Sequence, residues 1–278
     1  CFELVNLNYW EPKVREYILS VIGFWIDEFD IDGIRLDCAD CLEFSFMEEM
    51  RRYTNEKKAD FWLMGEVIHG DYSRYVSVDK LDSVTNYELH KGLYSGHNDH
   101  NYFEIAHTIR REFDANGGIY KGLKLYSFVD NHYPVHTLLY TLPGIPSLYY
   151  GSEWGIQGRK EGANDDPLRP AVDLKEALEH VPDPKLLQWV KTLGRIHKEQ
   201  PALSEGRYQE LLLTNRQYAF ARILEDEGVI VAVNNDDKDA YLSIRVPMQG
   251  KTYTSLLNGS VIKEENGALQ VKLAPNES

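Results

Sequence analysis

Two carboxylates at the ends of short apolar runs are the sharpest candidates for chemistry in this sequence. Asp37 and Glu66 each close such a run, and Arg35 precedes Asp37 by two positions. On a strand, residues two apart share one face, so the guanidinium is expected beside the Asp37 carboxylate. A neighbouring cation keeps an Asp ionised as a nucleophile, whereas apolar neighbours such as Trp62 and Met64 favour the protonated, proton-donating form of a Glu.

Carboxylates with such different surroundings suit a retaining glycosidase, which holds its two carboxyl groups about 5 to 5.5 Å apart. Residue spacing also allows a purely structural interpretation. In that case Arg35 and Asp37 form an ion pair that ends a strand, and Glu66 is a solvated surface residue.

The elements around these residues alternate between helix and strand. Apolar spacing predicts helices over residues 12–29, 44–55, 102–113 and 135–142, and short apolar runs predict strands over 34–37, 61–64, 83–86, 125–129 and 145–150. Such alternation is typical of parallel βα units, and a polar residue follows each strand, as at the catalytic face of a βα barrel. A closed barrel needs eight strands. The five predicted here therefore form either an open sheet or part of a barrel whose three upstream strands are absent.

The C-terminal quarter of the chain has a different pattern. A helix over residues 184–199 ends before Pro201, and short strands are predicted over 210–213, 218–224, 229–233, 241–246 and 253–257, separated by turn sequences. We therefore expect two domains: the C-terminal part of a βα domain over residues 1–203, and an antiparallel β-sandwich over residues 204–278.

Composition narrows the class of ligand. The chain has 278 residues, of which 43% are hydrophobic and 27% charged, as in ordinary globular proteins. Its net charge of −14 disfavours nucleic acid and anionic membranes as partners.

The first residues lack the pattern of a secretory signal and start at Cys1, so we expect a piece of a longer, cytoplasmic protein. Three cysteines exclude a disulfide framework, and Cys38 and Cys41 are expected to be ordinary buried thiols rather than metal or redox ligands.

Four segments together resemble the alpha-amylase family of glycoside hydrolases. They are residues 32–37 (DGIRLD), 64–67 (MGEV), 128–132 (FVDNH) and 141–151 (TLPGIPSLYYG), in that order. Within the family the sequence is most similar to the neopullulanase, cyclomaltodextrinase and bacterial amylase group. The resemblance implies a (β/α)₈ TIM barrel, of which strands four to eight are present, followed by an all-β antiparallel sandwich.

The same resemblance implies a role for each site residue. Asp37 is the nucleophile, Glu66 the general acid and base, Arg35 the residue that orients the nucleophile, and Asn131 and His132 bind substrate hydroxyls. The implied reaction is retaining hydrolysis of α-1,4-glucosidic bonds in starch, maltooligosaccharides or cyclodextrins through a covalent glucosyl-enzyme. No metal ligand and no cofactor is assigned to this chain, although the family's calcium site belongs to the upstream part.

The sequence departs from the family pattern after His132. The family has Asp at the next position, where this chain has Tyr133. We expect that a segment is missing between these two residues, and that the chain alone is inactive. The departure also keeps a second hypothesis open, namely a non-catalytic relative that binds carbohydrate or acts as a scaffold.

Tyr149 and Tyr150 are candidate platforms for stacking sugars, and strand alternation predicts that only one of them faces the site.

Overall fold

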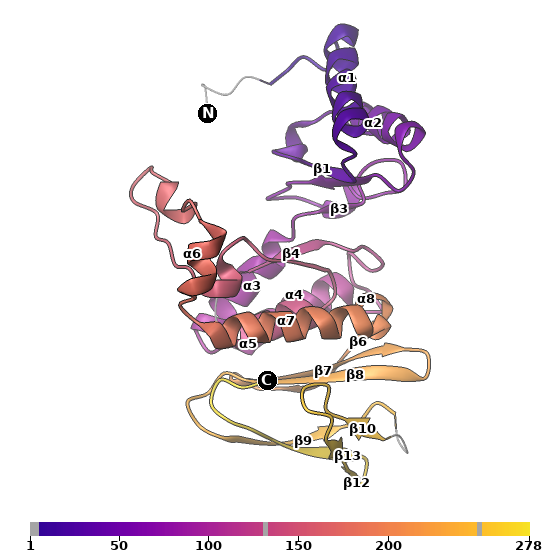
Figure 1. Cartoon of the computed structure of the whole chain (residues 1–278). Helices are drawn as coiled ribbons and strands as arrows, with labels where there is room; N and C mark the ends of the chain where they lie inside the picture. The colour runs from indigo at the N-terminus through magenta and orange to yellow at the C-terminus, as the bar shows by residue number, and fades with distance from the viewer. Residues whose placement is uncertain (1–5, 130–132, 249–251) are drawn as a thin grey trace. The chain divides into compact units, whose positions relative to one another are not determined.

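The computed structural model describes residues 6–129, 133–248 and 252–278, and it divides into two compact units. The first unit comprises Cys1–Tyr87 and Ile119–Tyr126, and the second comprises Glu88–Gly118 and Ser127–Ser278. Figure 1 shows the order of the elements along the chain. Among the described residues, no helix combines the length and the apolar character that a membrane crossing requires.

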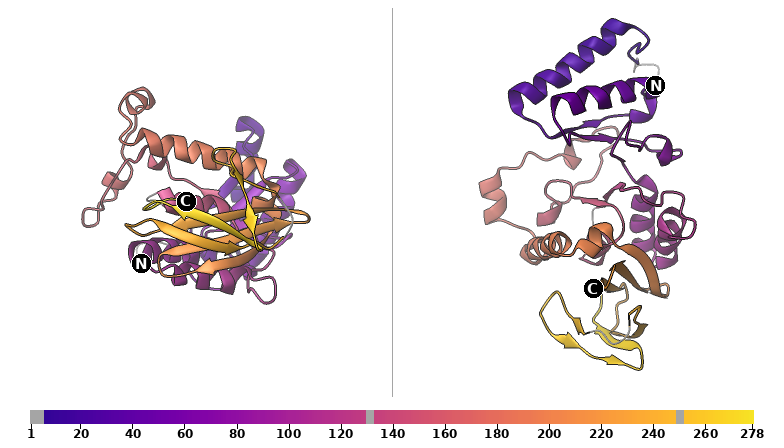
Figure 2. Two further views of the ribbon diagram at one scale, coloured as in Figure 1. Left: turned by 90° about the horizontal axis from the view of Figure 1, so that it is seen from below. Right: turned by 90° about the vertical axis from the view of Figure 1, so that its right-hand side faces the viewer.

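The first unit is built on a three-stranded parallel sheet. Its elements are α1 (Pro12–Phe29), β1 (Gly33–Leu36), α2 (Phe44–Lys57), β2 (Trp62–Gly65) and β3 (Ser83–Val84). The strand order is β1-β2-β3, and the register pairs Leu36 with Gly65 and Gly65 with Val84. The two helices pack against each other, as the right-hand view of Figure 2 shows. Because the strands are parallel and in close register, their carboxyl ends meet at one edge of the sheet.

The helical part of the second unit follows the predicted alternation. It contains α4 (Tyr102–Phe113), β4 (Tyr126–Phe128), α5 (Tyr133–Thr141), β5 (Ile145–Ser147), α6 (Leu174–Glu179), α7 (Pro184–Glu199) and α8 (Pro201–Glu205). β4 pairs with β5. The first residue of β4, Tyr126, lies in the first unit, and its other residues lie in the second. Five strands, β1 to β5, therefore precede the β domain in the described residues, which is the predicted number.

Three α-helices of the described residues were not predicted from the sequence: the short helices α6 and α8, and the longer α3 (Tyr87–Asn98). α3 contains Gly92 and Gly96, and glycine lowers helix propensity by about 1 kcal/mol per residue relative to alanine. Gly96 allows α3 to approach α4 closely. A Cβ atom at this position would lie 3.0 Å from the Asn101 carbonyl oxygen and 3.1 Å from Ile105. The residue that obscured the helix in the sequence is thus one that its packing requires.

The C-terminal domain is antiparallel, as predicted. One sheet contains β6 (Arg207–Leu213), β7 (Gln217–Leu224) and β8 (Glu227–Asn234), and another has the order β12-β13-β9, formed by Glu264–Glu265, Ala268–Leu273 and Ala240–Arg245. A short pair joins β10 (Tyr253–Thr254) to β11 (Val261–Ile262). Buried apolar side chains, among them Ala219, Leu242 and Ile244, form the core between the larger sheets.

Two details of the strand prediction for the C-terminal domain were wrong. The strand expected over 253–257 ends at Thr254, and β11, β12 and β13 were not predicted. β11 and β12 have two residues each, too few to show a period. β13 begins with two successive buried residues, Ala268 and Leu269, so its alternation is broken at the start.

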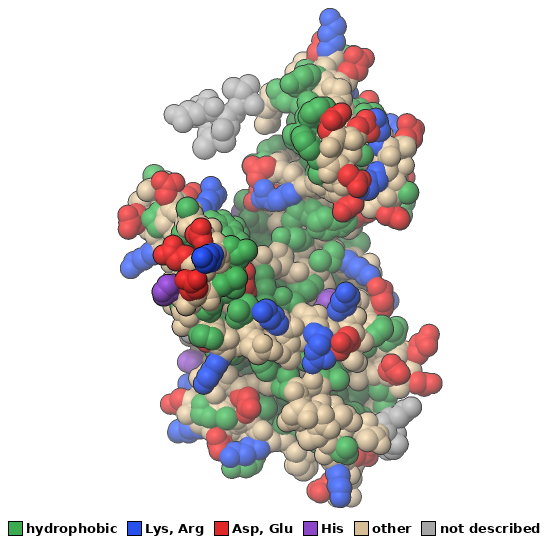
Figure 3. Space-filling model, viewed as in Figure 1, with side chains coloured by type: hydrophobic (Ala, Val, Ile, Leu, Met, Phe, Trp, Pro, Cys, Tyr) green, Lys and Arg blue, Asp and Glu red, His purple; other side chains and the backbone are tan. Residues whose placement is uncertain are grey.

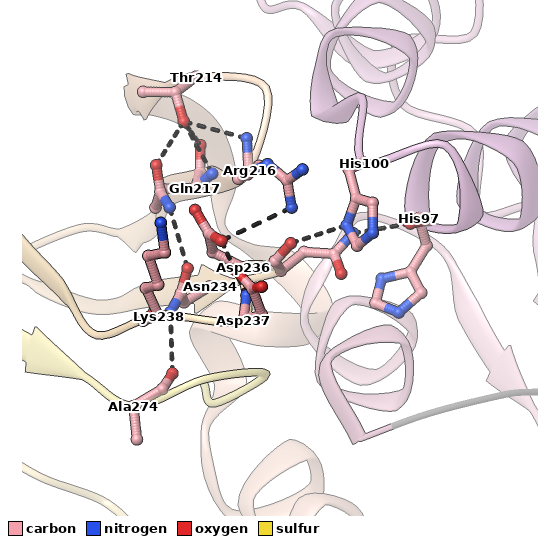
Figure 4. Close-up of polar contacts among 11 residues, drawn as sticks. His97, His100, Thr214, Arg216, Gln217, Asn234, Asp236, Asp237, Lys238 and Ala274 are labelled. Atoms are coloured by element: carbon pink, nitrogen blue, oxygen red, sulfur yellow. Dashed lines mark hydrogen bonds and ion pairs between the residues drawn. The ribbon is translucent and has the colours of Figure 1, made fainter.

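Within the second unit, a buried asparagine connects the helices to the β domain. The side chain of Asn235 donates a hydrogen bond to the His97 carbonyl oxygen at 2.7 Å, and the backbone carbonyl oxygen of Asn235 lies 2.8 Å from Nδ1 of His100. His97 and His100 are labelled in Figure 4. The Asn235 backbone N–H donates to the Arg216 carbonyl oxygen at 2.7 Å. Asn235 therefore ties the turn between α3 and α4 to the turn between β6 and β7.

Candidate active site

The structure brings Asp37, Glu66 and Arg35 together at the carboxyl edge of the parallel sheet. Arg35 places Nη1 2.9 Å from Oδ1 of Asp37 and Nη2 2.9 Å from Oε2 of Glu66. Carboxylate oxygens of Asp37 and Glu66 lie within 4.8 Å of each other and of the Cys38 sulfur. One guanidinium thus bridges two carboxylates that leave adjacent strands.

Backbone hydrogen bonds fix the two strand ends relative to each other. The Glu66 N–H donates to the Leu36 carbonyl oxygen at 2.8 Å, and the Ala39 N–H donates to the Glu66 carbonyl oxygen at 2.8 Å. Between these two contacts, Cys38 adopts a left-handed conformation with φ +46°, which is unusual for a residue other than glycine. The sharp turn leaves the Asp37 side chain 76% exposed, whereas that of Glu66 is only 14% exposed.

Glycine is required where the turn meets β2. A Cβ atom on Gly65 would lie 2.6 Å from Leu81 and 2.8 Å from the Ala39 side chain. Any larger residue would push the turn after Asp37 away from the strand that carries Glu66. The glycine in the sequence MGEV therefore sets the distance between the two carboxylates.

Electrostatics differ between the two acids. The pKa of Asp37 is lowered, first by its hydrogen bond with the Glu66 carboxyl group and then by Arg35. Glu66 was expected among apolar neighbours, but both of its carboxylate oxygens contact polar groups. Arg35 lies at Oε2, and the Tyr87 hydroxyl donates to Oε1 at 2.9 Å. Of the expected apolar neighbours, Trp62 lies against Tyr126, with ring centroids 6.3 Å apart.

The sequence did not identify Tyr87 or Cys38 as residues of this site. Tyr87 carries no recognisable motif, because its position depends on a helix that was not predicted. Cys38 and Cys41 were expected to be buried, but both are exposed. Their exposure follows from the turn after Asp37, which places them beyond the end of β1.

The donors around Cys38 do not suit calcium. The described part of the chain contains a group of side chains whose ligand atoms lie close enough to hold a metal ion, namely Asp37, Cys38 and Glu66. Calcium takes six to eight oxygen ligands, whereas this group offers a thiol and two carboxylates that already pair with Arg35. These residues therefore fit an arginine-bridged acid pair better than a calcium site.

Other predicted residues lie elsewhere or outside the described part. Asn131 and His132, together with the junction before Tyr133, fall outside the described residues. Tyr149 and Tyr150 do not follow the predicted alternation, because β5 ends at Ser147. Both are about half exposed, and both line a cavity of about 910 Å³ in the second unit.

Comparison with known proteins assigns both parts of the chain. Residues 1–115 match the family model for the catalytic domain of alpha-amylase, and residues 208–278 match the model for the C-terminal domain of maltogenic amylase. The chain is thus similar to the alpha-amylase family in its catalytic part and in its C-terminal part. The resemblance found in the sequence motifs is thereby confirmed.

The named relatives of this chain are about twice its length. A cyclomaltodextrinase of Geobacillus thermopakistaniensis is 28% identical over 298 residues, covering 98% of this chain and 48% of the relative. Neopullulanase 2 of Thermoactinomyces vulgaris is 27% identical, covering 95% of this chain and 47% of the relative. The chain thus spans about half the length of the curated relatives that it matches.

Solved structures agree with the fold. An Anoxybacillus alpha-amylase matches with a TM-score of 0.80 and 25% identity, covering 99% of this chain and 63% of that one. An alpha-amylase of Geobacillus thermoleovorans, complexed with acarbose, matches with a TM-score of 0.82 and 24% identity. The predicted fold class, part of a (β/α)₈ barrel followed by an all-β domain, is confirmed.

Proposed function

We propose that the protein carrying this chain is a retaining glycoside hydrolase of α-1,4-glucosidic bonds. One observation carries the proposal: Asp37 and Glu66 have oxygens within 4.8 Å of each other and share Arg35. Retaining glycosidases hold their carboxyl groups about 5 to 5.5 Å apart, whereas inverting enzymes need about 6.5 to 9.5 Å to admit a water molecule. The short separation favours the retaining mechanism.

The mechanism assigns one carboxyl group to each role. The Asp37 carboxylate attacks the anomeric carbon while Glu66 gives its proton to the departing glycosidic oxygen. The resulting glucosyl ester on Asp37 is then hydrolysed by water, from which Glu66 takes a proton, so both groups return to their starting states. A lowered Asp37 pKa suits the nucleophile, because the carboxylate stays ionised. The two carboxyl groups and water balance the reaction without a cofactor.

The relatives support the substrate class. They include proteins named cyclomaltodextrinase, neopullulanase and maltogenic alpha-amylase. We therefore propose starch, maltooligosaccharides or cyclodextrins as substrates of the whole protein. A relative from Bacillus subtilis is named intracellular maltogenic amylase, which supports a cytoplasmic location as part of the same proposal.

Substituting each carboxylate in the full-length protein tests the two roles. Asp37→Asn should nearly abolish turnover of every substrate, because an amide cannot form the glycosyl ester. Glu66→Gln should depend on the leaving group: fluoride needs little protonation, so the variant should keep more activity on α-glucosyl fluoride than on maltooligosaccharides. The measurement is kcat/KM for both substrates.

A matched control is Asp40→Asn, an exposed acid three residues from Asp37 that should leave both rates near wild type. Equal losses for Asp37→Asn and Glu66→Gln on both substrates would contradict the assignment of roles. A wild-type protein that binds maltooligosaccharides without cleaving them would instead support the non-catalytic hypothesis.

A further inference from the structure

Tyr87 makes a direct contact with the candidate general acid. It follows β3 and begins α3, and its hydroxyl donates a hydrogen bond to Oε1 of Glu66 at 2.9 Å. The other oxygen of the same carboxyl group, Oε2, lies 2.9 Å from Nη2 of Arg35. Tyr87 therefore contacts one oxygen of the Glu66 carboxyl group, and Arg35 contacts the other.

The carboxyl group of a glutamate has no strong torsional preference of its own. Its last torsion, between sp³ and sp² carbons, is broad rather than confined to staggered wells. A general acid must nevertheless present its proton to the leaving oxygen in one direction. Donors at both oxygens fix the plane of the carboxyl group: the Tyr87 hydroxyl at Oε1, and Arg35 together with the Cys38 N–H, 3.4 Å away, at Oε2. The contact of Tyr87 at Oε1 restrains a rotation that donors at Oε2 alone would allow.

The backbone that carries Tyr87 is tied to the backbone that carries Glu66. The Thr85 N–H donates to the Gly65 carbonyl oxygen at 3.1 Å, and the Val67 N–H donates to Oγ1 of Thr85 at 2.9 Å. The Thr85 hydroxyl in turn donates to the Val67 carbonyl oxygen at 3.0 Å, and Thr85 is buried. These bonds flank Glu66 on both sides, so the Tyr87 hydroxyl meets a carboxyl group whose backbone is already fixed.

Tyr87 is a donor rather than a proton-transfer group. Its pKa is raised to about 12, mainly because burial disfavours the phenolate, and then through the hydrogen bond to Glu66 and the charge of that residue. The hydroxyl consequently keeps its proton throughout the neutral range.

We propose that Tyr87 is a positioning residue that holds the Glu66 carboxyl group in the orientation needed for proton donation to the leaving group. The inference rests on the proposed function and adds a residue to it. It predicts that loss of the Tyr87 hydroxyl slows only the steps in which Glu66 donates or accepts a proton.

The test compares two substrates in the full-length protein. Tyr87→Phe removes only the hydroxyl, and it should lower kcat/KM on maltooligosaccharides by about 10-fold, the effect of losing one hydrogen bond. On α-glucosyl fluoride the loss should be at least about threefold smaller, because fluoride departs with little protonation. Tyr87→His, which keeps a ring donor, should recover part of the oligosaccharide activity. The matched control is Tyr17→Phe, which removes an exposed hydroxyl on α1.

A double-mutant cycle separates positioning from a general structural role. In the Glu66→Gln background, adding Tyr87→Phe should change activity on α-glucosyl fluoride little, since the group that Tyr87 positions can no longer donate a proton. Equal losses on both substrates, or a full additional loss in the Glu66→Gln background, would overturn the inference while leaving the proposed function intact. A wild-type protein inactive on both substrates would refute the proposed function and this inference with it. Thermal unfolding of each variant identifies any loss that is due to unfolding.

Discussion

The residue after the candidate nucleophile, Cys38, has a left-handed backbone conformation. Cys38 has a φ of +46°, a conformation that costs a residue with a Cβ atom free energy on the order of 1 kcal/mol. The hydrogen bond from the Ala39 N–H to the Glu66 carbonyl oxygen holds this turn. The strained residue lies directly between Asp37 and that contact. The turn thus keeps the nucleophile at the end of its strand and beside the acid on the next one.

Substitution of Arg35 tests whether its charge keeps the Asp37 carboxyl group ionised. The pKa of Asp37 is lowered first by the hydrogen bond with Glu66 and second by Arg35, so removing the guanidinium should raise it. The nucleophile must be ionised, and a higher Asp37 pKa leaves less carboxylate at acidic pH. The acidic limb of the pH profile of kcat/KM should therefore move to higher pH in Arg35→Gln. In Arg52→Gln, a change at an exposed arginine of α2, the limb should stay in place. An unmoved acidic limb in Arg35→Gln would show that Arg35 does not act on Asp37 through its charge.

At the scale of elements, the sequence predicts what is locally periodic and misses what depends on packing. The bounds predicted for α1, α4 and α7 match the structure, since each helix has an uninterrupted apolar spacing. α3 escaped prediction because its glycines are explained only by the approach of α4. For the same reason the sequence indicated the Asp37, Arg35 and Glu66 group but not Tyr87. The contact between Tyr87 and Glu66 arises from the pairing of β2 with β3, and no spacing along the chain encodes it.

Asn235, in the turn after β8, should contribute strongly to the free energy of unfolding. Asn235 is 1% exposed and connects the α3–α4 turn to the β domain through its side chain and backbone. Asn235→Ala leaves the buried His97 carbonyl oxygen without this donor, so the free energy of unfolding should fall by about 1 to 3 kcal/mol. Gln270→Ala removes an exposed bond to Ser243 and is the control, with an expected change within about 0.5 kcal/mol. Urea unfolding followed by circular dichroism measures both. Equal stability of the two variants would mean that the Asn235 bonds contribute nothing net.

Among its own described residues, the first unit leaves two surfaces without a covering element. β1 ends the three-stranded sheet order, so in the described part of the chain one of its edges has no neighbouring strand. On α1, Tyr17, Phe24 and Trp25 are 67%, 53% and 42% exposed, and Figure 3 shows hydrophobic side chains on the surface of this helix. Open strand edges and clustered exposed aromatic residues are common sites of association between chains. The chain covers 48% of its cyclomaltodextrinase relative. Its described residues form five strands before the β domain, whereas a closed barrel has eight.

We therefore predict that the 278-residue chain, produced alone, associates through the aromatic face of α1 and does not hydrolyse starch. Light scattering coupled to size-exclusion chromatography should give a mass above the 32.1 kDa of one chain. The paired substitution Tyr17→Lys and Phe24→Lys should shift the mass toward that value, because two charges on this face oppose apolar contact between copies. Tyr241→Lys, which changes a 76% exposed tyrosine of the β domain, should leave association unchanged. A wild-type chain that elutes as a single 32.1 kDa species and hydrolyses starch would contradict the prediction, since the open edge and the aromatic face would then need no partner.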